Sequence, residues 1–472
     1  MDLKNLTIKK THEHFINGDF TALDLVKEYL KNIESKNKDL NAYLEVFNDV
    51  EEQAKLADEK IKSGKSTLLT GIPFAIKDNI LIEGRIASSA SKILENYHAT
   101  YDATVIKKLK EQGVIFLGRT NMDEFAMGGS TENSAYGVTK NPHDTSRVAG
   151  GTSGGSAAAV ASDLALVALG SDTGGSIRQP SSFCGTVGLK PTYGGVSRYG
   201  LMAAASSFDQ IGPIAKTVSD VEIIWNELQG KDSMDSTTID AKTYPKEVLK
   251  NKKPVVGIPR DFMNQGGIEK EILENFESTI QKLKSNGFEV VDISIPSIKY
   301  SLAAYYIIIF AEESSNLARF DGVKYGLHKE GKNLLEDYLI TRGEGFGKEV
   351  RRRILLGTYV LSSGYYDAYY NKANIVRALI KNDFLEAFKK VDVILTPTTP
   401  SSAFKIGEKV TDPLQMYLED IFTVTANLTG MPAISVPSGK TKDGLPLGIQ
   451  FTANLGREDV LFNIGKDFYE SK

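Results

Sequence analysis

The chain is poor in cysteine and has no excess of positive charge, and each shortage excludes a class of protein. Its 472 residues contain one cysteine, Cys184, so no disulfide can form within the chain. This is typical of a protein of the reducing cytoplasm, and we expect Cys184 to be a small buried apolar residue. The formal net charge of −4 provides no overall attraction for nucleic acid.

The chain also lacks long apolar runs and histidine clusters. The longest run, 302–310, is about half the length needed to cross a membrane, and the first residues lack the basic and apolar segments of a secretory signal. None of the histidines lies in a glycine-rich segment, and their spacing does not match a zinc site. We therefore expect no membrane contact and no metal. The histidines are His12, His14, His98, His143 and His328.

Glycine and small hydroxyl residues are instead concentrated between residues 149 and 193. Gly-Gly-Thr-Ser-Gly-Gly-Ser (150–156) and Gly-Ser-Asp-Thr-Gly-Gly-Ser-Ile-Arg-Gln-Pro (170–180) place Thr152 and Ser176 on tight loops. A glycine in a regular element costs roughly 0.5–1 kcal/mol more than alanine, so close approach to a substrate explains these glycines better than packing does. A plain turn remains an alternative, whereas the spacing fits neither a P-loop nor a dinucleotide fingerprint.

Ser176 is a candidate nucleophile, because a serine after two glycines can be approached closely. Successive backbone N–H groups of this loop form a candidate oxyanion hole. We expect its donors to be Thr173, Gly174, Gly175 and Ser176.

Lys77 is a candidate base, because it ends the apolar run 71–76. A buried amine with a lowered pKa can accept a proton. The alternative is a lysine whose stem packs on apolar surface while its amine reaches water. Since no histidine lies in these motifs, a serine nucleophile would need another base, and lysine is the known substitute.

Helical spacing alternates with short apolar runs, which predicts an α/β fold with a mixed central sheet covered by helices. We expect helices through 1–65, starting one of them at a capping box from Thr21 to Asp24. Further helices are expected at 102–112, 156–168, 268–285 and through much of 300–385. Strands are expected at 71–76, 114–117, 254–259, 289–295, 391–395, 434–437 and 448–452.

We expect one domain over residues 1–472, because no repeat or long flexible linker interrupts the chain. Its parts are a helical N-terminal region (1–65), a core with the catalytic residues (66–230) and a second half with a helical substrate-pocket insertion (231–472).

The segments 71–79, 150–156 and 170–180 resemble the amidase signature family, and the similarity runs from about residue 20 to 465. The resemblance implies the amidase signature fold, with helices on both faces of the sheet, and a Ser–cis-Ser–Lys triad. Ser176 would be the nucleophile and Lys77 the base. The bridging position falls on Thr152, so this chain carries a threonine where the family has a serine. Ser153 is the alternative relay.

Other segments resemble the glutaminase subunits of tRNA-dependent amidotransferases within that family. The resemblance implies hydrolysis of L-glutamine and a heterotrimer with B and C subunits. This chain would need no cofactor, while a partner would use ATP and Mg²⁺ to amidate mischarged Glu-tRNA(Gln) or Asp-tRNA(Asn) in the cytoplasm. The segments are 121–128, 134–137, 316–322, 361–370 and 427–432.

The resemblance also suggests a clamp for zwitterionic glutamine. Arg353 would hold the α-carboxylate with two hydrogen bonds and Asp420 the α-ammonium group. Without the resemblance, Arg351–Arg353 would be interpreted as a solvated basic helix face. The further substrate-binding candidates are Tyr305, Gly128 and Ser130.

Two other functions stay open. A stand-alone amidase would act on other amides and would not need the clamp. A non-catalytic scaffold subunit would keep only the fold, and Thr152 is the feature that favours it.

Overall fold

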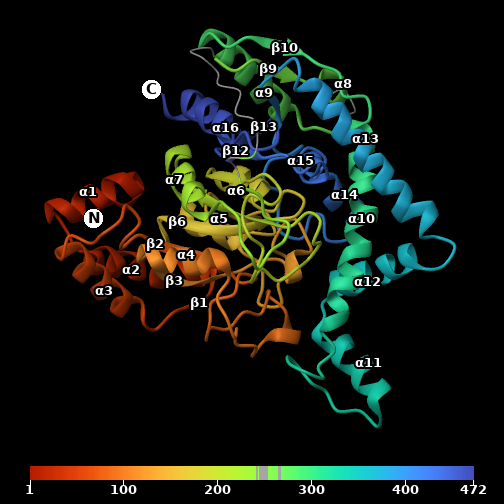
Figure 1. The fold of residues 1–472 in the computed structure, drawn as a ribbon, viewed down its shortest axis with the longest axis horizontal. Coiled ribbons are helices and arrows are strands. Elements are labelled where there is room, and N and C mark those ends of the chain that lie inside the picture. The colour runs from red at the N-terminus through yellow and green to blue at the C-terminus, as the bar shows by residue number, and fades with distance from the viewer. Residues whose placement is uncertain (241–242, 244–252, 264–266, 472) are drawn as a thin grey trace.

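An eleven-stranded mixed sheet runs through the middle of the molecule (Figure 1). The computed structural model describes residues 1–240, 243, 253–263 and 267–471. Parallel and antiparallel neighbours both occur, as the sequence predicted. In spatial order the strands are β1 (Tyr43–Val46), β3 (Ile115–Thr120), β2 (Pro73–Lys77), β6 (Val167–Asp172), β8 (Gln210–Ala215), β7 (Val187–Lys190), β12 (Ala433–Lys440), β13 (Pro446–Ala453), β11 (Val393–Pro397), β9 (Val256–Ile258) and β10 (Val290–Asp292). A separate small ribbon pairs β4 (Lys140–Asn141) with β5 (Asp144–Val148).

The N-terminal region is helical except for one strand. The capping box is present, since Thr21 and Asp24 cap each other's backbone N–H groups at the start of a helix. The expectation of helices alone was wrong at β1, which follows a left-handed Asn41 and pairs with β3. The helices are η1 (Leu3–Asn5), α1 (Ile8–Asn17), α2 (Ala22–Leu40) and α3 (Val50–Lys62).

Helices of the central region flank the sheet. The helix expected over 156–168 is shorter, because Asp163 takes a positive φ of 60° and reverses the chain before β6. Cys184 ends a helix and is buried, as predicted. The helices here are η2 (Lys92–Leu94), α4 (Thr104–Gln112), η3 (Glu124–Ala126), α5 (Gly154–Ala161), α6 (Arg178–Cys184) and α7 (Val218–Leu228).

The second half contains the predicted helical insertion. The long helices α10 to α13 gather on the side of the molecule opposite α1 to α3 (Figure 1). Within the part of the chain described, no helix is long and apolar enough to cross a membrane. The helices are α8 (Arg260–Met263), α9 (Lys270–Ser285), η5 (Ile298–Tyr300), α10 (Ser301–Asn316), η6 (Leu317–Arg319), α11 (Leu334–Gly345), α12 (Lys348–Leu361), η7 (Asp367–Asn371), α13 (Lys372–Ala387), α14 (Pro413–Leu418), α15 (Val424–Thr429), α16 (Glu458–Gly465) and η8 (Lys466–Glu470).

The sheet brings the sequence motifs together at one edge. Strands β2 and β6 are parallel neighbours, with Phe74 opposite Val167 and Ile76 opposite Leu169. Their carboxyl ends therefore meet, and they carry Lys77 and Asp172 respectively. Each glycine-rich motif supplies a loop and the start of a helix here, at α5 and at α6.

Candidate active site

Lys77 is buried at the end of β2 among hydroxyl groups. Its Nζ lies 2.7 Å from Thr152 Oγ1, 2.8 Å from Ser153 Oγ and 2.9 Å from Ser171 Oγ. Burial lowers the pKa of Lys77 to about 7, although nearby carboxylates, Asp123 first among them, oppose the shift. A substantial fraction of this amine is therefore neutral near pH 7 and able to accept a proton.

Thr152 and Ser153 both contact this amine, but only Thr152 has a hydroxyl free for a further partner. The peptide bond between Gly151 and Thr152 is cis. Ser153 Oγ donates to the Ser171 carbonyl at 3.1 Å and accepts from the Ser171 N–H at 3.3 Å. Among the described residues, Thr152 Oγ1 bonds to Lys77 alone. Ser153 thus fastens the loop to β6, whereas Thr152 can still donate its proton.

Ser176 lies directly beside these two residues. Its carbonyl accepts the Ser153 N–H at 3.0 Å, which joins the two glycine-rich motifs. The residue is 8% exposed, and no described side chain or backbone group bonds to its hydroxyl. The Ser176 hydroxyl is therefore uncommitted.

The predicted oxyanion hole needs one correction. The Gly175 N–H donates to Asp172 Oδ1 at 2.9 Å, so this donor is already used within the loop. The N–H groups of Thr173, Gly174 and Ser176 make no hydrogen bond to an acceptor in the described chain. Three of the predicted donors thus remain for a developing negative charge.

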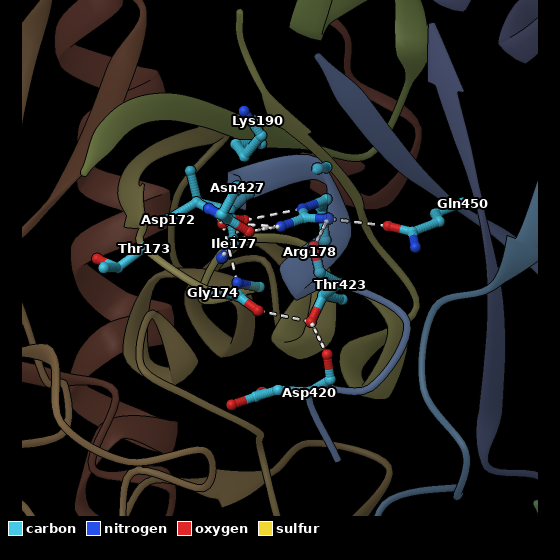
Figure 2. A network of polar contacts seen from close by, with 12 residues as sticks. Asp172, Thr173, Gly174, Ile177, Arg178, Lys190, Asp420, Thr423, Asn427 and Gln450 are labelled. Carbon is cyan, nitrogen blue, oxygen red and sulfur yellow. Dashed lines mark hydrogen bonds and ion pairs between the residues drawn. The ribbon is translucent and has the colours of Figure 1, made fainter. Parts of the chain in front are cut away.

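A buried ion pair that sequence reasoning missed holds this loop (Figure 2). Arg178 donates from Nε to Asp172 Oδ2 at 3.0 Å and from Nη2 to Asp172 Oδ1 at 2.9 Å. Burial alone would raise the pKa of Asp172, but the guanidinium outweighs it and holds that pKa well below its usual range. Opposite charges six residues apart in a glycine-rich motif were the available signal. The other partners of the pair are the N–H groups of Gly175 and Ile177, and Asn427, Thr423 and Gln450.

Arg353 is buried on α12 and does not lie on a solvated helix face, unlike the exposed Arg351. Its Nε donates to Glu349 at 2.8 Å and its Nη1 to Glu313 at 3.1 Å. The sequence did not indicate these glutamates, because Glu313 lies on α10 and reaches Arg353 only after folding. The rings of Tyr306, Phe310 and Tyr417 surround the guanidinium.

Asp420 lies between α14 and α15, near Arg353. It accepts a hydrogen bond from the Tyr306 hydroxyl at 2.6 Å, and Tyr306 also packs against the Arg353 guanidinium. Burial raises the pKa of Asp420 to about 7. The two members of the predicted clamp thus share an aromatic neighbour.

The remaining candidates border the same region from two sides. The segment 173–176, which carries the candidate oxyanion donors, is called the oxyanion loop below. Tyr305 lies against it, since a Cβ at Gly174 would overlap the Tyr305 hydroxyl. Gly128 and Ser130 line a small pocket together with Arg353. A Cβ at Gly151 would lie 2.6 Å from the Ser130 nitrogen, so this pocket adjoins the loop of Thr152. Asp420 and Tyr305 do not line that pocket.

Known proteins share this architecture over the whole chain. The amidase family matches residues 24–462. The A subunit of glutamyl-tRNA(Gln) amidotransferase from Thermoanaerobacter pseudethanolicus is 53% identical, covering 100% of this chain and 97% of its own length. The corresponding protein of Thermodesulfovibrio yellowstonii is 53% identical over 95% of this chain and 94% of its own.

Solved structures agree. The crystal structure of the glutamyl-tRNA(Gln) amidotransferase A subunit from Thermotoga maritima is 43% identical and has a TM-score of 0.81, with 99% of this chain and 95% of that chain covered. A structure described as an amidase is 27% identical with a TM-score of 0.83, covering 98% of this chain and 99% of its own.

Proposed function

The chain belongs to the amidase family, and from this membership we propose that it is the glutamine-hydrolysing subunit of a tRNA-dependent amidotransferase. The observation that carries the proposal is the contact of the buried Lys77 amine with Thr152 Oγ1, in a loop that is hydrogen-bonded through the Ser153 N–H to the carbonyl of Ser176. A nucleophile, a bridging hydroxyl and a base with a lowered pKa are the parts required for acyl transfer without histidine.

In the first half of the reaction, neutral Lys77 takes the proton of Thr152, and Thr152 takes that of Ser176. Ser176 Oγ attacks the side-chain amide carbon of glutamine. The C=O π bond opens and its electron pair moves to oxygen, where the free N–H groups of the loop stabilise the negative charge. Lys77 is now an ammonium group.

In the second half, the intermediate collapses and the C–N bond breaks. The charged Lys77 returns its proton through Thr152 to the leaving nitrogen, so ammonia departs and a γ-glutamyl ester remains on Ser176. Water then attacks the ester with the same groups acting as base and acid, which releases glutamate and restores the serine.

The clamp residues select glutamine among amides. We assign the α-carboxylate to Arg353 and the α-ammonium group to Asp420, which are both buried charges near Tyr306. Tyr305 contacts the oxyanion loop, and Gly128 and Ser130 line the pocket on the side of Thr152.

The ammonia leaves for a partner. In this proposal, B and C subunits complete a heterotrimer in the cytoplasm. The B-type partner holds ATP, Mg²⁺ and the mischarged tRNA. A net charge of −4 on this chain agrees with leaving tRNA binding to another subunit.

The test is ammonia release from L-glutamine by the chain co-expressed with its partner subunits. We expect ammonia release by the Ser176→Ala variant to fall to the background rate. Ser181→Ala is the matched control, because this buried serine of α6 has no hydrogen-bond partner for its hydroxyl among the described residues. Undiminished release from Ser176→Ala would exclude this serine as the nucleophile.

A stand-alone amidase is the second candidate, favoured by one observation. Arg353 is already paired with two glutamates, so its guanidinium is not presented as an open fork. Hydrolysis of a neutral primary amide faster than of glutamine would support this alternative. A scaffold subunit would instead keep full function in the Ser176→Ala complex.

A further inference from the structure

Thr423 connects the oxyanion loop with the segment that carries Asp420. It is fully buried immediately before α15. Its Oγ1 donates to the Gly174 carbonyl at 2.6 Å, and its own carbonyl accepts from Arg178 Nη1 at 2.8 Å (Figure 2). Its N–H donates to the Asp420 carbonyl at 3.1 Å. A single side chain thus joins two parts of the candidate site that lie far apart in the sequence.

The hydroxyl of Thr423 holds one end of a particular peptide group. The Gly174 carbonyl and the Gly175 N–H belong to the same planar unit and point in opposite directions. Thr423 Oγ1 holds the carbonyl, and Asp172 Oδ1 holds the N–H at 2.9 Å. The plane is therefore fixed at both ends by side chains from distant elements.

This peptide group needs such fixing because it joins two glycines. Gly175 has φ of +135°, a conformation that side-chain-bearing residues rarely adopt. Without a Cβ on either side, the two residues themselves add little steric resistance to rotation of the plane. A rotated plane would turn the Gly174 carbonyl, a hydrogen-bond acceptor, out of its present position and change the direction of the neighbouring N–H donors.

We propose that Thr423 is a positioning residue for amide hydrolysis: its hydroxyl keeps the 174–175 peptide in the orientation that leaves the Gly174 and Ser176 N–H groups free for the oxyanion. The inference rests on the proposed function. It predicts that loss of the hydroxyl reduces stabilisation of the transition state and leaves glutamine binding largely intact. The reason is that the Thr423 hydroxyl bonds to the loop at the Gly174 carbonyl, whereas it contacts Asp420 only at the main-chain carbonyl and not at the carboxylate.

The test compares Thr423→Val, which has nearly the same shape without the hydroxyl, with Thr423→Ser, which retains it. Loss of a whole oxyanion donor lowers kcat by about 10²–10³. Since the donors here would be misoriented and not removed, we expect Thr423→Val to lower kcat by roughly 10–100-fold and to change KM by less than about threefold. Thr423→Ser should restore kcat to within about threefold of the parent.

The matched control is Thr429→Val, at the last residue of the helix that Thr423 precedes. Thr429 is buried and its hydroxyl also donates to a backbone carbonyl, that of Thr425 at 2.8 Å, but it does not contact the oxyanion loop. Its kcat should stay at the parent value. All variants are measured in the complex with partner subunits, and thermal unfolding reports whether each assembles. Thr423→Ala replaces the valine variant if valine prevents assembly.

Several results would overturn the inference. These are an unchanged kcat in Thr423→Val, a loss that appears only in KM, and a serine variant as slow as valine. Failure of both hydroxyl-free variants to assemble would assign Thr423 to folding instead. Failure of the proposed function is distinguishable, because the parent complex would then release no ammonia from glutamine. The same comparison of variants would then be made on a neutral amide that Ser176 hydrolyses, and absence of any amide hydrolysis would overturn both.

Discussion

The carboxyl-terminal ends of β2 and β6, called the strand edge below, carry Lys77. Buried charges are paired differently there from those in the helical region around Arg353. At the strand edge, Asp172 and Arg178 form a two-bonded pair whose remaining groups all have partners. Around Arg353, two glutamates face one guanidinium, and Glu313 Oε2 is buried without a hydrogen-bond partner in the described chain.

The two regions therefore differ in the role of their buried charges. Burial raises the pKa of Glu313 above its usual range, although the Arg353 guanidinium opposes the shift, so burial disfavours the ionised form of this carboxyl. The buried charged groups of the strand edge thus already have their partners, and this arrangement fixes the positions of the reacting groups. In the proposed role of the helical region as substrate clamp, the pairing of its donors and carboxyls would change when glutamine binds.

Replacement of Lys77 by methionine should have the largest effect and tests the strand edge. Methionine fills the space but cannot accept a proton. Because general base catalysis contributes about 10²–10⁴-fold, we expect kcat for glutamine hydrolysis to fall by roughly that factor. Lys190→Met is the control, since burial also lowers the pKa of Lys190 to about 7, yet within the described part of the chain its amine bonds only to the Pro191 carbonyl.

The pH dependence of kcat should also report on Lys77. Below a pH of about 7 the amine is protonated and cannot act as base, so kcat should rise as pH increases through this value. Asp420 has a similar pKa, but in its proposed role as ligand of the α-ammonium group its ionisation should change binding and therefore KM. A kcat at saturating glutamine that stays flat between about pH 6 and about pH 8 would contradict Lys77 as base.

Replacement of Arg353 by lysine tests the helical region and should act on binding. Lysine keeps the charge but loses the planar pair of donors. Loss of a hydrogen bond to a charged group costs about 1.5–3 kcal/mol, so we expect KM for glutamine to rise roughly 10–100-fold with a smaller change in kcat.

Arg351→Lys on the same helix is the control for this change, because Arg351 is exposed and should tolerate lysine. A neutral amide should be hydrolysed equally well by the parent and by Arg353→Lys. If KM for glutamine stays the same in Arg353→Lys, the α-carboxylate is bound elsewhere and the second region is not the substrate clamp.

The same comparison explains how much the sequence could predict. Every strand expected from an apolar run was found, although the ends differ by a few residues. The mixed sheet was predictable from the alternation of helical spacing and short apolar runs, whereas the contact of Lys77 with Thr152 was expected only from the resemblance to the amidase signature family. β6, β7 and β8 were missed, since their short runs contain glycine or proline and show no clear alternation.

What the sequence could not predict depends on contacts between distant segments. Glu313 and Arg353 are forty residues apart on different helices, and the use of the Gly175 N–H by Asp172 depends on loop geometry. The buried threonine before α15 gave no sequence signal, although it contacts the best-recognised motif of the chain. Tertiary packing decides such contacts, so local patterns do not reveal them.

Replacement of Thr152 by serine should have the smallest effect on kcat. It tests whether serine and threonine can both act as the bridging residue between Lys77 and the nucleophile. Serine keeps the hydroxyl that lies 2.7 Å from Lys77 and removes the methyl group that restricts χ1. We therefore expect kcat to change by less than about threefold, whereas Thr152→Val should lose roughly as much as Lys77→Met. Ser153→Ala should retain more activity than Thr152→Val, because Ser153 is occupied by the β6 backbone. The reverse order of activities would identify Ser153 as the bridging residue. Protons would then be relayed by the same residue that fastens the loop to β6.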